Sequence, residues 1–330
     1  MRRVLVTGAT GCIGRALTGK LLARDLEVRV LVRDPNAFHR IFPQAAAKVT
    51  VICGELSDSI ALNRAVHGVD TIFHLAAKVH VVPPCPAQSN AFRVNVEDTR
   101  RLLLACRNDS LRTFVFFSTI AVFGAKSCPL SEEVKCTPDT PYGVSKYETE
   151  QVIQHYFAGS EVRPTVLRLA MVFGEGDRGN FLRMVRAIGR RRFFLPGRGD
   201  AQKSIAYSGN VADVAIQAAT TERARGEVFV IADAVWTVRE LAQCIARALG
   251  MPSPTLQIPA WALHIAGKSL QRLRATFGVN VPFTDMDARA LLRGTVCDTS
   301  KVRRILGFEP GVSVEEGIAR TIKWYRSTSM

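Results

Sequence analysis

The segment VLVTGATGCIGRAL, residues 4–17, decides the fold class of this chain. It begins as a short apolar run, passes through three evenly spaced glycines (Gly8, Gly11 and Gly14), and continues with a helical pattern. Glycines between a strand and a helix permit a tight turn and let backbone N–H groups approach a pyrophosphate at the helix N-terminus. The spacing is G-x-x-G-x-x-G, and its place at a strand-to-helix junction predicts a dinucleotide-binding loop.

Strand-like and helix-like segments alternate through the first half of the chain. Apolar runs typical of buried parallel strands span 3–7, 27–32, 49–53, 71–76, 113–118 and 164–169. Helical periodicity appears between them, at 14–25, 59–68, 89–107 and 145–157. This alternation predicts an α/β fold, a doubly wound parallel Rossmann sheet.

The pattern becomes less regular after residue 172. A strand is expected at 227–232 and helices at 237–249, 284–292 and 313–327, and a proline-rich loop at 81–88. We therefore expect a Rossmann domain at 1–172, to which about 208–235 return, and a smaller mixed α/β substrate lobe formed mostly by 173–330. Ligands of open α/β sheets bind at the carboxyl edge, so the substrate pocket is expected between the two parts.

Composition indicates a globular protein with an excess of positive charge. The 330 residues are 47% hydrophobic and 22% charged, with a formal net charge of +15. Basic residues gather at 186–203, RAIGRRRFFLPGRGDAQK. Such a cluster is either a solvated basic face or a site for an anionic ligand. We expect a small anionic molecule rather than nucleic acid.

Targeting and membrane signals are weak. Residues 1–11 run directly into the glycine loop without an apolar leader, so a cytoplasmic location is expected. The most apolar stretch, IPAWALHIAG at 258–267, is too short to span a membrane; it is expected to begin a buried helix, with weak interfacial membrane contact as the alternative. Without a C-x-x-C pair, the eight cysteines are expected to be reduced and mostly buried.

The end of the second expected strand bears on the choice of cofactor. Val32 stands where an acidic residue would bind the ribose hydroxyls of NAD, and Arg33 follows it. An arginine there can bind the 2′-phosphate of NADP, so NADP(H) is preferred. If Arg33 simply faces solvent beside Asp34, NAD(H) remains possible.

The segment PYGVSK, residues 141–146, combines a tyrosine and a lysine four residues apart. That spacing places Tyr142 and Lys146 on one helix face, and a hydroxyl at the end of the preceding strand, Thr119, can meet them at the carboxyl edge. Hydride exchange at a carbinol carbon needs one general acid or base and one hydrogen-bond donor. The three residues behind a dinucleotide loop therefore predict a redox site.

Four motifs together carry a family resemblance: the glycine loop, HLAA (74–77), STIAVFG (118–124) and PYGVSK (141–146). They resemble the extended short-chain dehydrogenase/reductases, in particular the nucleotide-sugar branch of the NAD-dependent epimerase/dehydratase family. The ending at 298–325 is also similar to that family. The resemblance covers essentially the whole chain.

The resemblance implies roles for individual residues. Tyr142 would transfer the proton, Lys146 would hold the nicotinamide ribose and lower the pKa of the tyrosine, and Thr119 would hydrogen-bond the reacting oxygen. Asn95 would brace the site. The implied cofactor contacts are Gly8, Thr10, Gly11, Cys12, Ile13, Gly14, Arg33, Glu55, Leu56, Leu75, Ala76, Ala77, Asn95, Tyr142 and Lys146.

For the substrate, the resemblance implies a nucleotide diphosphate sugar bound by Thr119, Asn180 and Lys203, with Arg293 as a second phosphate contact. Lysine replaces the arginine common in that branch, and it cannot bind phosphate in bidentate fashion. The segment RLAMVFG (168–174) lacks the usual proline, which leaves an apolar wall. Epimerisation and net keto-reduction both remain open, and a 3β-hydroxysteroid dehydrogenase-like or flavonoid-type ketone reductase is the alternative.

Other classes are disfavoured. The histidines lack Cys, Asp or Glu at metal spacing, so no metal site is expected, and the absence of a G-x-S-x-G motif argues against a hydrolase. A non-catalytic dinucleotide-binding regulator would be expected to lack Tyr142 or Lys146, and both are present. Helices around 88–107 and 141–158 could pair in a homodimer.

Overall fold

A seven-stranded parallel sheet forms the centre of the computed structural model, which describes residues 1–45, 48–78, 92–106, 110–126, 128–277, 289 and 291–328. The strand order is β10-β6-β5-β4-β1-β2-β3, and every neighbouring pair is parallel. The strands are β1 (Arg3–Thr7), β2 (Glu27–Val32), β3 (Val49–Cys53), β4 (Thr71–His74), β5 (Thr113–Thr119), β6 (Thr165–Leu169) and β10 (Val228–Ile231). The predicted doubly wound sheet is confirmed.

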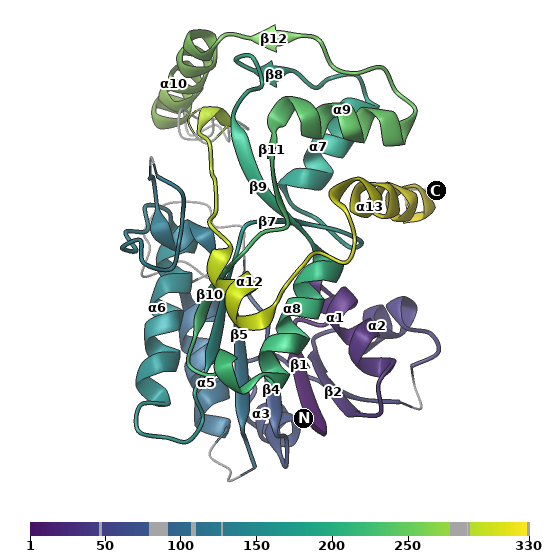
Figure 1. Ribbon diagram of the computed structural model, residues 1–330, viewed down its shortest axis with the longest axis vertical. Coiled ribbons are helices and arrows are strands. Elements are labelled where there is room, and N and C mark those ends of the chain that lie inside the picture. Colours follow the sequence, from purple (N-terminus) through teal and green to yellow (C-terminus); the bar gives the residue numbers. More distant parts are fainter. Residues whose placement is uncertain are drawn as a thin grey trace.

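Helices cover both faces of this sheet (Figure 1). Val4 and Val6 pack toward one core, and Leu5 between them packs toward the other, as the two-residue period of a strand requires. The first core is closed by α1 (Cys12–Leu22), α2 (Pro35–Ile41), α8 (Ser208–Thr220) and α12 (Ser300–Leu306). The second is closed by α3 (Ser59–Val66), α5 (Asp98–Ala105) and α6 (Pro141–Tyr156).

A smaller sheet lies above the carboxyl ends of the large one (Figure 1). Its order is β11-β9-β7, with β9 parallel to β7 and antiparallel to β11. The strands are β7 (Met171–Phe173), β9 (Gln202–Tyr207) and β11 (Ala234–Thr237). They share a core with α7 (Asn180–Gly189), α9 (Val238–Leu249) and α13 (Val314–Thr328). This smaller mixed part was expected.

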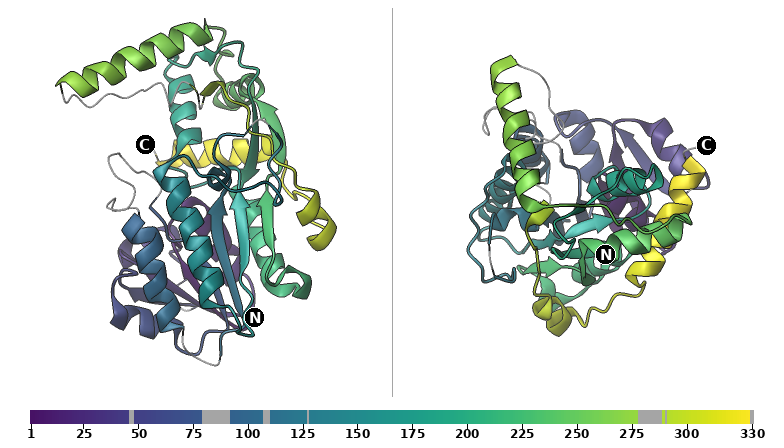
Figure 2. Two further views of the ribbon diagram at one scale, coloured as in Figure 1. Left: turned by 90° about the vertical axis from the view of Figure 1, so that its left-hand side faces the viewer. Right: turned by 90° about the horizontal axis from the view of Figure 1, so that it is seen from above.

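The far end of the molecule carries a two-stranded ribbon and a long helix. Strand β8 (Leu195–Pro196) pairs in parallel with β12 (Gln257–Ile258), and α10 (Ala260–Phe277) follows directly. Figure 2 shows α10 extending along the end opposite the N-terminal strand. The prediction of a buried helix start is wrong in part: Leu263 is buried, but Trp261 is 68% and Ile265 58% exposed.

Several local details differ from the sequence patterns. The described part of the helix expected at 89–107 starts as a π-helical turn, η1 (Arg93–Glu97), and two 3₁₀ turns, η2 (Ile120–Phe123) and η3 (Glu222–Ala224), were not expected. The loop 81–88 lies outside the described residues, as does most of 284–292. The described cysteines are free thiols, as expected. Cys53 and Cys128 are exposed, so the prediction of burial is wrong for these two.

Candidate functional site

The glycine-rich loop joins β1 to α1 in a tight turn that leaves no room for a Cβ on Gly8 or Gly14. Gly11 donates its N–H to the Gly8 carbonyl at 3.0 Å, and it occupies the N-cap of α1, where it has no side chain to cap the helix. A Cβ on Gly14 would lie 2.1 Å from the Gly8 oxygen and 2.9 Å from Ala9 Cα. Because both neighbours are backbone, only glycine fits. The first-turn N–H groups of α1 therefore face the loop without a capping side chain, as an anion-binding helix start requires.

A buried chain of hydrogen bonds ties the end of β1 to the end of β4. The Thr7 hydroxyl accepts from Ala76 N–H at 3.2 Å and lies 2.8 Å from His74 Nδ1. His74 Nε2 lies 2.8 Å from Thr99 Oγ1, which donates to the Asn95 carbonyl at 2.6 Å. Thr99 donates its one hydroxyl proton to the Asn95 carbonyl, so it can only accept from His74 Nε2. The imidazole proton therefore lies on Nε2, and Nδ1 accepts from the Thr7 hydroxyl. Burial, with the Lys146 charge as a smaller cause, lowers the pKa of His74 to about 3, so the ring is neutral.

Asn95 links the segment after β4 to the helix that carries Tyr142. Its Oδ1 accepts the Lys78 N–H at 2.8 Å, and its Nδ2 donates to the Lys78 carbonyl at 3.2 Å and to Ser145 Oγ at 2.9 Å. The side chain is 2% exposed. Leu75, Ala76 and Ala77, which precede Lys78, are half-buried at the carboxyl edge of the sheet.

The start of α6 lies against the turn that follows β5. Thr140 caps α6 by accepting the Gly143 N–H at 3.1 Å, with Pro141 at the first turn. A Cβ on Gly143 would lie 2.5 Å from the Ala121 carbonyl oxygen, so the main chains of α6 and η2 touch there. Thr119 caps η2, its hydroxyl oxygen accepting the Ala121 N–H at 3.2 Å. This contact brings Thr119 and Tyr142 to the same part of the carboxyl edge.

Lys146 is 2% exposed, one helical turn after Tyr142. Its Nζ lies 4.0 Å from the centre of the Phe116 ring. Burial lowers the pKa of Lys146 to about 7, opposed by the charge of Glu150. The expectation of a lowered pKa at Tyr142 is wrong, because removal of the phenol from water raises that pKa to about 12.

A buried ion pair lies behind Lys146 and was missed from the sequence. Arg168 Nη2 on β6 donates to Glu150 Oε2 at 2.8 Å, and its Nε lies 3.2 and 3.3 Å from the two carboxylate oxygens. The Glu150 side chain is fully buried, and the Ser118 hydroxyl also donates to it. Glu150 lies one turn beyond Lys146 on α6. That i, i+4 spacing pointed to a lysine–glutamate contact but not to Arg168, the partner of Glu150 on β6.

Arg33, Glu55 and Leu56 lie at the ends of neighbouring strands. Arg33 is exposed directly after β2, and the adjacent Asp34 is engaged as the N-cap of α2, accepting the Ala37 N–H at 3.0 Å. Glu55 is exposed after β3, and Leu56 is buried. The pairing of β2 with β3 therefore places these expected cofactor contacts at one edge.

The structure brings two of the expected substrate residues together. Lys203 Nζ on β9 donates to the Arg293 carbonyl at 2.6 Å, and the main chain of Lys203 forms an isolated parallel β-bridge with Thr295. Burial and the nearby Arg293 charge lower the pKa of Lys203 to about 8. Asn180 starts α7, where its exposed side chain accepts a hydrogen bond from Arg183. Asp177, which accepts the Gly179 and Leu182 N–H groups at 2.7 and 3.0 Å, shapes that helix start and was not anticipated.

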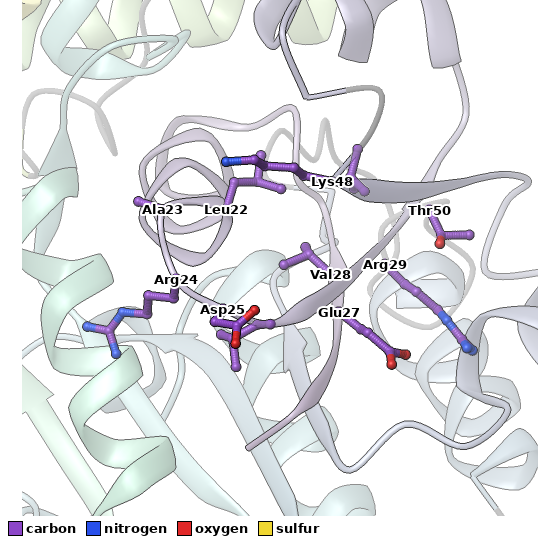
Figure 3. Close-up of a pocket in the computed structure, with 11 residues that line it drawn as sticks. Leu22, Ala23, Arg24, Asp25, Glu27, Val28, Arg29, Lys48 and Thr50 are labelled. Carbon is purple, nitrogen blue, oxygen red and sulfur yellow. The ribbon is translucent and has the colours of Figure 1, made fainter.

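A hollow at the opposite edge of the sheet is unrelated to these residues. Figure 3 shows it among the starts of β2 and β3, with Arg24, Asp25, Glu27, Arg29 and Lys48 on its walls. Both charge signs are present, so it does not select an anion. Within the part of the chain that the structure describes, no group of His, Cys, Asp and Glu side chains is arranged to hold a metal ion.

The comparisons with known proteins show the family of the chain. The model of the NAD dependent epimerase/dehydratase family matches residues 4–232, which run from β1 to just past β10. The chain belongs to this family.

Relatives in the family act on different substrates. The chain is 27% identical over 324 residues to N-acetyl-α-D-glucosaminyl-diphospho-ditrans,octacis-undecaprenol 4-epimerase of Escherichia coli O157:H7, covering 97% of this chain and 94% of that protein. It is 25% identical over 338 residues to a 3-beta-hydroxysteroid dehydrogenase of Mycolicibacterium neoaurum, covering 98% and 91%. The solved structure of MoeE5 in complex with UDP-glucose and NAD is 25% identical, with a TM-score of 0.76 and coverage of 99% and 100%.

The loop has the features that a nicotinamide dinucleotide of this family requires. Gly8 and Gly14 have no room for a Cβ beside neighbouring main-chain atoms, so the main chain of the turn carries no side chain at these positions, and the N-terminus of α1 has no capping side chain. The buried Thr7–His74–Thr99 chain holds the backbone at Ala76, whose nitrogen a Cβ on Gly8 would approach to 2.8 Å. The described residues therefore fit such a cofactor.

Proposed function

We propose that the chain is an NAD(P)-dependent nucleotide-sugar epimerase or keto-reductase in which Thr119, Tyr142 and Lys146 form the hydride-transfer site. The observation that carries this proposal is the buried lysine with a pKa near 7, one turn after a tyrosine at the carboxyl edge. Burial of a lysine at this position costs desolvation, which a lysine without a role in the site could avoid by lying on the surface. When bound, the nicotinamide supplies the acceptor and donor of a hydride.

The three side chains would divide the proton chemistry. With a pKa raised to about 12, Tyr142 is protonated at neutral pH, and in the reducing half-reaction it would donate that proton to the developing alkoxide. In the oxidising half-reaction of an epimerase, the Tyr142 phenolate would take the proton back from the substrate hydroxyl. The Thr119 oxygen already accepts the Ala121 N–H, which leaves its own proton to donate to the same substrate oxygen. The Lys146 ammonium would hold the cofactor ribose and stabilise the phenolate that forms when Tyr142 gives up its proton.

For the cofactor we propose NADP(H) in preference to NAD(H). Arg33 is exposed at the end of β2, and Asp34 beside it already caps α2. The guanidinium can therefore bind a 2′-phosphate without competition from that carboxylate. The remaining proposed contacts follow the glycine loop around the edge: Thr10, Cys12, Ile13, Glu55, Leu56, Leu75, Ala76, Ala77 and Asn95.

For the substrate we propose a sugar carried on a diphosphate, a nucleoside diphosphate sugar in the first place. Lys203 and Arg293 lie together and supply positive charge, and Asn180 stands at the start of α7. The E. coli relative acts on a sugar diphosphate linked to undecaprenol, and MoeE5 binds UDP-glucose. A polyprenyl diphosphate sugar therefore belongs in the test.

A sterol or similar ketone is the second candidate. Ala170 is buried and Met171 is half-buried at the start of β7, where a polar residue is common in nucleotide-sugar enzymes. The M. neoaurum relative is a 3-beta-hydroxysteroid dehydrogenase. An apolar wall suits such a ring system.

A thermal-shift panel tests the substrate class. UDP-, GDP- and dTDP-sugars, a short-chain polyprenyl diphosphate sugar and a 3β-hydroxysteroid are each added with NAD or NADP. Compounds that stabilise the protein are then incubated with it, and products and reduced cofactor are measured. An epimerase converts the sugar with no net change in cofactor, whereas a reductase consumes NADPH. The sugar proposal fails if none of the sugar diphosphates stabilises the protein and none is converted.

The matched pair Tyr142→Phe and Tyr147→Phe tests the site. Both residues are half-buried tyrosines on α6, five positions apart in the sequence, but only Tyr142 has the proposed role. We expect Tyr142→Phe to lose at least about 100-fold in kcat, the lower end for general acid catalysis, with cofactor affinity retained. Tyr147→Phe should keep its activity. Equal activities of the two variants would contradict the assignment.

We also propose that the protein forms a cytoplasmic homodimer through α5 and α6. Leu104 on α5 is 51% exposed, an apolar side chain available to a second copy. Light scattering of the wild type and of Leu104→Glu tests the dimer, since a charge in that interface should produce monomers. An unchanged molar mass would contradict it.

A further inference from the structure

The end of the molecule formed by β12 and α10 exposes large apolar side chains. Leu256, Trp261 and Ile265 are 65%, 68% and 58% exposed. Lys268 and Arg272 follow on the same helix and are also exposed. We call these five residues the α10 patch. None of them belongs to the proposed cofactor or substrate site.

Four members of the α10 patch form a single stripe along the helix. Trp261, Ile265, Lys268 and Arg272 are spaced by four, three and four residues, which keeps them on one helix face. Leu263 and Gly267, on other faces, are buried. The stripe is therefore the outward face of α10, apolar in its first half and basic in its second.

The surroundings of the stripe are basic. The sequence has no aspartate or glutamate from residue 241 to residue 284. Arg190, Arg191 and Arg192 are exposed just before β8, and the Leu195 N–H of β8 donates to the Leu256 carbonyl at 2.8 Å. The three arginines therefore precede a strand that is hydrogen-bonded to the segment carrying Leu256. Figure 1 shows β8, β12 and α10 together at one end of the molecule.

From this combination we propose that the α10 patch docks on the surface of an anionic lipid bilayer. Tryptophan favours the interface between water and acyl chains, exposed leucine and isoleucine enter the acyl boundary, and lysine and arginine bind anionic headgroups. A second copy of this face would bring the same basic residues together and repel it. Nucleic acid would match the charge but would not need a leucine and an isoleucine.

The contact is peripheral. Among the helices described, none is both long enough and apolar enough to cross a bilayer. Docking would orient the carboxyl-edge site relative to the lipid surface, which goes beyond the proposed function. Because the test measures binding and not turnover, it gives the same answer whatever the enzyme's substrate.

The experiment is co-sedimentation of the full-length protein with vesicles of phosphatidylcholine alone or mixed with phosphatidylglycerol. We expect binding to the mixed vesicles that weakens with salt. Lys268→Gln/Arg272→Gln should bind about 25-fold more weakly, at roughly fivefold per basic residue. Trp261→Ser/Ile265→Ser should lose at least about tenfold by removing apolar burial.

Matched controls separate the patch from bulk charge and hydrophobicity. Arg24→Gln/Arg304→Gln removes the same charge from exposed positions elsewhere and should bind like the wild type. Ile60→Ser removes an isoleucine that is 72% exposed on α3 and should also have no effect. All variants are on the surface, and their melting temperatures verify folding.

Three results would overturn the proposal. The first is no binding of wild type to phosphatidylglycerol vesicles. The second is an equal loss in the control and patch variants, which would mean attraction by net charge alone. The third is self-association that the Trp261→Ser/Ile265→Ser variant abolishes while vesicle binding is unchanged, which would assign the patch to a second copy.

Discussion

Replacing Glu150 by glutamine is expected to destabilise the protein far more than breaking a surface ion pair. The carboxylate is fully buried and accepts hydrogen bonds from Arg168 and Ser118. Glutamine is nearly the same size but neutral. The change therefore leaves the Arg168 guanidinium, whose side chain is only 8% exposed, without its counter-charge.

The size of the effect follows from that burial. Removing one partner of a buried ion pair costs about 3–5 kcal/mol, because the other charge stays desolvated. With an unfolding entropy of about 2.1 cal/mol/K per residue, the 330-residue chain would lose about 4–7 °C in Tm. Glu150→Gln/Arg168→Met removes both charges and should recover most of this loss.

Thermal and urea unfolding of the purified variants measure this loss of stability. The matched control is Glu316→Gln, which breaks a Glu–Arg pair with half-exposed side chains on α13. That change should cost less than about 1 kcal/mol. A buried, unpaired Arg168 charge would not be the cause if Glu150→Gln is no less stable than Glu316→Gln, or if the double variant is no more stable than Glu150→Gln alone.

The same substitution has a second readout at Lys146. Glu150 raises the pKa of that lysine against the effect of burial. Without the negative charge the pKa should fall below about 7, so the ammonium form is lost at a lower pH. If activity needs that form, the alkaline limb of kcat moves to lower pH in Glu150→Gln. Ser118→Ala, which keeps the charge, should leave that limb in place.

Three further predictions concern the cofactor loop and the buried histidine. Gly14→Ala places a methyl against the Gly8 carbonyl, which should cost about 1–3 kcal/mol of stability and weaken dinucleotide binding. The control is Gly311→Ala, whose Cβ meets nothing within 4 Å, and equal melting and binding curves for the two variants would contradict the prediction. Arg33→Ala should weaken NADP binding about tenfold or more by calorimetry and spare NAD; an equal loss for both would remove Arg33 from 2′-phosphate recognition. The pKa of His74 falls from 6.5 to about 3 on folding, so the unfolded chain takes up the proton first and stability should decline as pH drops from 6.5 toward 3, by up to about 1.4 kcal/mol per pH unit. His74→Gln should flatten that slope.

The parallel sheet could be predicted from sequence because its signals are local. Each expected strand is a short apolar run beside a helical pattern, and all six formed at the expected positions. The glycine loop is equally local, since Gly8, Gly11 and Gly14 lie between one strand and one helix. The seventh strand, β10, joins β6 although 58 residues separate Leu169 from Val228, and only the return of an apolar run at 227–232 suggested it.

Features set by distant neighbours could not be predicted. The pairing of Glu150 with Arg168 depends on how α6 crosses β6, and the pattern of β6 indicated only a buried strand. The raised pKa of Tyr142 has the same origin, because the sequence shows a nearby lysine but not the depth of burial.

The exposed face of α10 could not be chosen from the sequence. The apolar run at 258–267 was compatible with a buried helix start, which was preferred, and with interfacial membrane contact, and its hydrophobicity does not show which side of the helix is covered. Nothing in the described fold packs over Trp261 and Ile265, which are more than half exposed. Which side of an apolar helix is covered depends on the elements available to cover it.

The contact between Gly143 and the Ala121 carbonyl bears on how this chain could diversify. That contact joins two main chains, so the spacing of Thr119 and Tyr142 does not depend on the side chains of the substrate lobe. Residues such as Met171, Asn180 and Lys203 come from separate segments and can change without moving it. Under the proposed function, reaction type and substrate choice can therefore evolve as independent modules, and a library confined to the proposed substrate residues should yield new specificities while Thr119 and Tyr142 keep their spacing.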